Sequence, residues 1–99
     1  MHSIKKLADA MKDEIEGAKE YAEDYVEAKA RGDVATANKY KEMALDELKH
    51  ANYEHEWAVN KIQEVSKIYT APVEMQEKWE HSHKEYVEKV AWIRQMLAM

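Results

Sequence analysis

Glutamate and histidine stand three residues apart in the stretch DELKHANYEHEW, at Glu47 and His50. If this stretch is helical, positions i and i+3 lie on one face, so the carboxylate and the imidazole point the same way. Helical bundles hold iron or manganese with this Glu-x-x-His pattern. The same spacing recurs at Glu80 and His83. The chemistry that these residue types offer is coordination of a divalent metal ion.

The spacing alone is weak support for a metal site. With 15 glutamates and five histidines among 99 residues, about one such pair is expected by chance. A solvated helix face that happens to contain histidines explains the two pairs as well. The positions of these residues in the fold therefore matter more than their spacing.

Glycine and proline, which interrupt helices, mark two corners in the chain. Gly32 can take the left-handed conformation at the end of one helix, and Asp33 can cap the start of the next. Pro72 fits the first turn of a third helix, with Thr70 as a cap candidate. Between these corners apolar residues recur every three or four positions, which predicts amphipathic helices.

The predicted fold is a single all-α domain over residues 1–99. Both corners are short, so neighbouring helices should be antiparallel, as an up-down-up bundle. The three long helices are expected at about 3–31, 33–69 and 72–97.

The first corner sets which residues face each other across the first two helices. If the chain folds back at Gly32, Glu14 lies at the level of His50, and Gly17 lies at the level of Glu47. Glu14 is the one charged residue in the apolar stripe of the first helix, and Gly17 leaves room opposite Glu47. Buried carboxylates need partners, and a divalent cation can satisfy several at once. Carboxylate and imidazole together suit iron, manganese or zinc.

These features resemble the first helical hairpin of the rubrerythrin and ferritin-like families, over about residues 10–55. The shared features are a glutamate in the first helix, an aromatic residue seven positions later (Tyr21), a glycine-containing corner and Glu-x-x-His in the second helix. The resemblance implies a ferritin-like hairpin with Glu14, Glu47 and His50 as metal ligands. In that family two hairpins form a four-helix bundle around a di-iron site with four carboxylates and two histidines. The chain is also similar to small uncharacterised rubrerythrin-like proteins of bacteria and their phages, which implies no settled activity.

The sequence departs from the family pattern in two ways. It has one further helix where the family has two, and it has no cysteine for a rubredoxin module. With the second corner near residues 71 and 72, Glu80 should face residue 63 and His83 should face residue 60. The second Glu-x-x-His pair should therefore not join the first within one chain.

A two-fold dimer could supply the missing ligands. Two copies of Glu14, Glu47 and His50 give four carboxylates and two imidazoles, which is the ligand count of the family. Glu54, Glu80 and His83 are weaker candidate ligands. Glu54 also fits a surface charge, Glu80 can pair with a lysine one turn on, and His83 fits a hydrogen-bonded position at the core boundary, as does His55.

The composition argues against several other classes of protein. Charged residues make up 35% of the chain with a net charge of −5, and there is no basic patch for nucleic acid. The absence of cysteine excludes disulfides and thiolate metal sites. No apolar run reaches membrane length and no signal-peptide pattern starts the chain, so no membrane association and a cytoplasmic location are expected.

The sequence therefore predicts a small ferritin-like helical protein that binds iron or manganese at the interface of a homodimer or higher homo-oligomer. If it is an enzyme, the resemblance implies a di-iron oxidase or peroxidase-like activity. The alternative is a metal-free helical oligomerisation or interaction module with a vestigial site.

Overall fold

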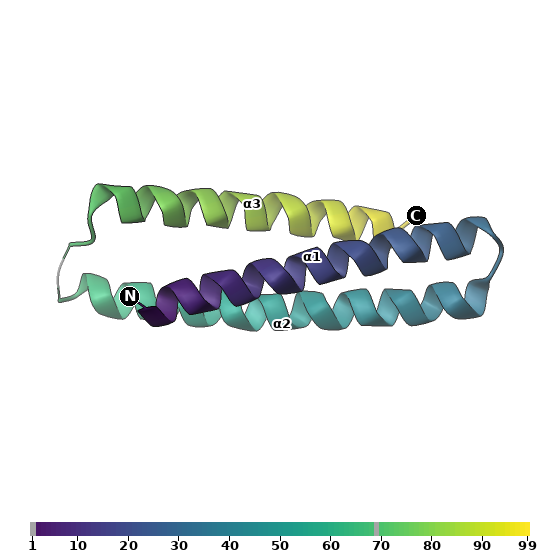
Figure 1. The fold of residues 1–99 in the computed structure, drawn as a ribbon, viewed down its shortest axis with the longest axis horizontal. Coiled ribbons are helices and arrows are strands. Elements are labelled where there is room, and N and C mark those ends of the chain that lie inside the picture. Colours follow the sequence, from purple (N-terminus) through teal and green to yellow (C-terminus); the bar gives the residue numbers. More distant parts are fainter. Residues whose placement is uncertain (1, 69) are drawn as a thin grey trace.

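A computed structural model describes residues 2–68 and 70–99, with side chains from Ile4 onward. The described chain forms three α-helices, α1 (His2–Ala30), α2 (Val34–Ser66) and α3 (Val73–Leu97). Figure 1 shows α2 returning along α1 and α3 running back beside them, in a rod of 55 × 17 × 16 Å. The prediction of an all-α chain with three long helices is confirmed. Over the described residues, no helix combines the length and the apolar character that crossing a bilayer requires.

The corner between α1 and α2 forms as predicted. Gly32 has a φ of +79°, in the left-handed region that glycine adopts without strain. The N–H of Gly32 donates to the carbonyl of Lys29, and that of Asp33 to the carbonyl of Ala28, both at 3.0 Å, which is the Schellman arrangement. The Asp33 carboxylate caps α2 by accepting from the Thr36 N–H at 3.1 Å. Hydrogen bonds from the backbone and side chain of Thr36 hold the pKa of Asp33 below its usual range.

The corner between α2 and α3 differs from the prediction. The second helix ends at Ser66, and Tyr69, its predicted end, lies outside the described residues. Pro72 occupies the N-cap of α3 with φ −56° and ψ 148°, so it stands just before the first turn and not within it. The prediction of Thr70 as the cap is wrong, since Pro72 is the N-cap and no side chain of the described residues caps α3. Thr70 is two residues too early to reach the first free N–H groups of the helix.

Small residues let α1 and α2 approach closely along their shared core. Alanines without exposed surface lie on both helices, and larger apolar side chains fill the spaces between them. Short side chains bring the two backbones together, so the polar side chains that flank this core also meet across it. The fully buried alanines are Ala18, Ala22, Ala28, Ala44 and Ala51.

The third helix joins the core mainly through its C-terminal half. Ile93, Met96 and Leu97 are buried, and Lys89 donates to the Glu16 carboxylate of α1 at 2.9 Å. The N-terminal half of α3 instead borders a groove of about 800 Å³, together with the start of α1 and the end of α2. The C-terminal half of α3 thus packs on one face of the α1–α2 hairpin.

Candidate metal centre

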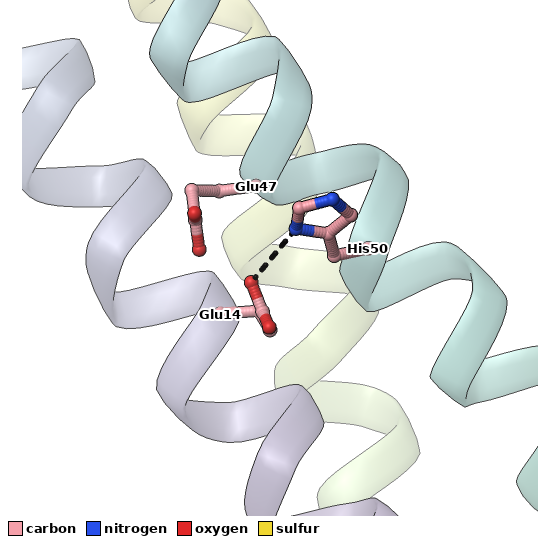
Figure 2. A group of neighbouring side chains, drawn as sticks. All are labelled: Glu14, Glu47 and His50. Carbon is pink, nitrogen blue, oxygen red and sulfur yellow. Dashed lines mark ion pairs between the residues drawn. The ribbon is translucent and has the colours of Figure 1, made fainter.

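Three predicted ligands lie together between α1 and α2. One ligand atom from each of Glu14, Glu47 and His50 can be chosen so that all lie within 4.8 Å of one another. Oε2 of Glu14 is 3.4 Å from Nδ1 of His50. Figure 2 shows the Glu14 side chain reaching from α1 toward the two side chains of α2. Among the residues that the structure describes, no other group of three potential metal-binding side chains comes this close.

The residues that face each other across α1 and α2 are those predicted from a fold-back at Gly32. Glu14 reaches His50, and a Cβ placed on Gly17 would lie 3.4 Å from Oε2 of Glu47. Gly17 therefore leaves open the space into which the Glu47 carboxylate extends. A larger side chain at this position would take up the room beside that carboxylate.

The carboxylates of Glu14 and Glu47 lie close enough to affect each other's charge. The hydrogen bond between Glu47 and Glu14 is the main cause that raises the pKa of Glu47, and burial raises it further. His50 has the opposite effect on the pKa of Glu47. Two adjacent carboxylates repel each other when both are ionised. A cation between them would offset that repulsion.

Glu54 extends the polar cluster along α2. It follows Glu47 by seven residues, about two helical turns, and so lies on the same face. Burial is the main cause that raises the pKa of Glu54, while a hydrogen bond with Glu14 and the nearby His50 lower it. Oε2 of Glu54 is buried and has no hydrogen-bond partner among the described residues. A buried carboxylate oxygen without a partner is costly, and a cation would satisfy it.

The cluster opens on the side of the hairpin that faces away from α3. Each residue turns the helix by about 100°, so Glu16, which binds α3, points to the side of α1 opposite Glu14. By the same count His55, which contacts α3, points about 140° away from His50 on α2. In Figure 2 the ribbon of α3 accordingly passes behind the three side chains. No helix of the same chain covers this face of the cluster among the described residues.

Exposed apolar side chains continue the stripe of the cluster along α2. Met43 and Trp57 lie seven residues to either side of His50, and are 41% and 58% exposed. Together with Glu47 and Glu54 they follow the alternating spacing of four and three residues that is typical of a helix-packing seam. We call these five residues, Met43, Glu47, His50, Glu54 and Trp57, the α2 stripe.

The second Glu-x-x-His pair lies elsewhere. Glu80 is exposed at the edge of the groove near the start of α3. His83 was predicted to face residue 60. It faces His55 instead, with 2.9 Å between His83 Nδ1 and His55 Nε2. The prediction was wrong because α2 ends at Ser66, which moves the second corner toward the N-terminus. As expected, neither residue joins Glu14 within one chain.

Sequence reasoning missed the specific partner of His55, although it placed this residue at a hydrogen-bonded boundary position. His55 and His83 lie in phase with the apolar stripes of their helices, and only the position of the second corner decides that they meet. Glu54, predicted as a weaker candidate ligand, lies on the same face of α2 as Glu47, and its two-turn spacing from Glu47 is visible in the sequence.

Comparisons with protein-family models, with curated proteins and with solved structures found no match for this chain.

Proposed function

We propose that this chain is a small ferritin-like helical protein that binds iron or manganese through Glu14, Glu47 and His50 at a homodimer interface. The observation that supports this proposal most is the convergence of two carboxylates and one imidazole from two helices within 4.8 Å. This mixed donor set suits iron, manganese or zinc, whereas calcium and magnesium sites use oxygen donors alone. The buried Glu54 oxygen without a partner offers one further donor atom beside the same cluster.

A second copy of the chain would complete the coordination. One chain offers three close donors on an open face of the hairpin. A two-fold axis through this face would place the same cluster of the partner opposite it, giving four carboxylates and two imidazoles. The exposed Met43 and Trp57 at the ends of the α2 stripe would then be buried against the partner hairpin. The dimer would thus resemble the four-helix arrangement of the ferritin-like families, with α3 on the outside.

The residues of each chain have distinct roles in this proposal. When bound, iron would supply reactivity toward oxygen or peroxide. Glu14 and Glu47 contribute negative charge, and because the pKa of Glu47 is raised, a cation competes with protonation of that carboxylate. His50 contributes an imidazole nitrogen donor, and Gly17 keeps open the space into which the Glu47 carboxylate extends.

A metal-free oligomerisation module is the second candidate function. The exposed tryptophans support it, because Trp57 on α2 and Trp92 on α3 are 58% and 56% exposed and suit contacts with other helices. In such a module protonation of Glu47, whose pKa is raised, would reduce the carboxylate repulsion.

Metal analysis separates the two candidates. The wild-type chain, Glu47→Ala and the control Glu23→Ala, which changes an exposed glutamate of α1, are purified with added Fe(II) or Mn(II) and analysed for bound metal. The proposal expects metal in the wild type and the control, and a loss of more than about tenfold in Glu47→Ala. Equal metal in all three proteins, or none in any, would leave the oligomerisation module as the function.

A further inference from the structure

Two histidines, His55 and His83, lie together between α2 and α3, on the side of α2 away from the Glu14–Glu47–His50 cluster. Nε2 of His55 and Nδ1 of His83 are 2.9 Å apart. The two ring centroids are 5.0 Å apart, so they are farther from each other than the two nitrogens are. The nitrogens therefore lie between the two ring centres, and the rings meet edge to edge.

Aromatic side chains of α3 hold the His55 ring in place. Tyr86 stacks on it at a centroid distance of 4.5 Å and an angle of 5°, and Trp79 lies 6.1 Å away at 16°. Burial, followed by the nearby His83, lowers the pKa of His55. This favours the neutral imidazole, which is the form that binds metal ions. His83 is exposed, so its ring is free to adjust.

We propose that His55 and His83 form a two-histidine site for a divalent late transition-metal ion, such as Zn²⁺ or Cu²⁺, that joins α2 to α3. Metal–nitrogen bonds of about 2.0–2.1 Å place two neighbouring ligands about 2.9 Å apart at a right angle and about 3.4 Å apart in a tetrahedron. At 2.9 Å the two nitrogens are joined by a hydrogen bond, so they lie about 0.5 Å closer than in a tetrahedral zinc site. Metal binding breaks this hydrogen bond and shifts the proton of the donor ring to its other nitrogen. The exposed His83 ring then turns so that both nitrogens face the ion. Water completes the coordination.

The donor set distinguishes this site from the Glu14–Glu47–His50 cluster. Its two donors are imidazole nitrogens, a ligand that suits zinc, copper and nickel. Carboxylates, which suit harder ions such as manganese, form most of the other cluster. The two sites point in nearly opposite directions from α2, so each can be tested without the other.

A metal ion bound to both histidines would strengthen the attachment of α3 to α2. Within the described part of the chain, His55–His83 is the one side-chain hydrogen bond that connects α2 with α3. An ion that binds both rings in the folded chain stabilises the folded state by mass action. Zinc should therefore raise the thermal unfolding midpoint by holding the N-terminal half of α3 against α2.

Zinc titration tests the site in a chain whose other cluster is disabled by Glu47→Gln and His50→Gln. In this background, calorimetry should detect one Zn²⁺ per chain, and adding His83→Asn should weaken binding by more than about tenfold. His81→Asn is the matched control, because His81 is an exposed histidine of the same helix whose one ion pair among the described residues is with Glu85. This control should bind zinc as the background does.

The thermal midpoint gives a second readout, and circular dichroism verifies that each variant is helical. Zinc should raise the midpoint of the background and of the His81→Asn variant, but not that of the His83→Asn variant. Absence of zinc binding in the background would overturn the proposal, as would zinc binding that His83→Asn leaves unchanged.

Discussion

Glu14 on α1 and His50 on α2 meet across the helical hairpin, with 3.4 Å between Oε2 of the carboxylate and Nδ1 of the ring. The contact depends on the corner at Gly32 and Asp33, where a left-handed glycine and a side-chain cap fix how α2 returns along α1. A shift of one residue at this corner would turn the α2 stripe by about 100° relative to α1. The corner and the cluster are therefore parts of one geometric arrangement.

Gly17→Ala should have opposite effects on stability and on metal binding. Alanine stabilises a helix interior by up to about 1 kcal/mol relative to glycine, and the new Cβ fits at 3.4 Å from Oε2 of Glu47. It fills the space in which this carboxylate would move toward an ion, so affinity for Mn(II) should fall several-fold. Urea unfolding and metal titration measure the two effects.

Glu23→Ala is the control for that variant. Glu23 is exposed on the same helix, so alanine there should change stability by about 0.5 kcal/mol or less. It is not part of the Glu14–Glu47–His50 cluster, and affinity for Mn(II) should stay as in the wild type. An unchanged affinity in Gly17→Ala would show that the space beside Glu47 is not used for binding.

Glu47→Gln should stabilise the metal-free chain at neutral pH. The folded-state pKa of Glu47 is raised above its unfolded value, of about 4.3. The stabilising contribution of its protonated form is thus present below the unfolded pKa and is lost as the pH rises through the folded pKa. Glutamine stays neutral throughout, so its advantage over wild type, up to about 1 kcal/mol after solvent screening, should be larger at pH 7 than at pH 4. Unfolding in the presence of a chelator at both pH values measures this, and an advantage independent of pH would contradict the assigned cause.

Trp57→Glu should disrupt the proposed dimer, whereas Trp92→Glu should not. The two tryptophans are almost equally exposed, at 58% and 56%, but only Trp57 belongs to the α2 stripe. A charge at the interface should weaken association by more than about tenfold and reduce the metal content with it. Sedimentation equilibrium measures association. Equal effects of both substitutions would place the interface somewhere other than the α2 stripe.

Ile93→Ala should cost about 2–5 kcal/mol in the free energy of unfolding. Ile93 is fully buried and is the main apolar residue through which α3 joins the core. Val87→Ala, at a position 51% exposed on the same helix, should cost about 0.5 kcal/mol or less. Urea denaturation compares them, and similar costs would mean that α3 is not packed as described.

The sequence was sufficient to predict the first corner. It also predicted that Glu14 lies opposite His50 and that Gly17 lies opposite Glu47. Gly32 and Asp33 carry strong local signals, and one well-defined corner fixes the position of every residue along two straight helices. The second corner contains Pro72 but no glycine, so local chemistry did not determine where α2 ends. The pairing of His55 with His83 was therefore missed. The side of the hairpin that α3 covers depends on packing between distant residues, such as Lys89 with Glu16, which no local pattern encodes.

Native mass spectrometry of the wild-type chain loaded anaerobically with Fe(II) or Mn(II) tests the central proposal most directly, because it reports assembly and metal content together. The proposal predicts a dimer of about 23 kDa, twice the 11.6 kDa chain, that carries metal and loses it in Glu47→Ala. A monomer without bound metal would contradict it.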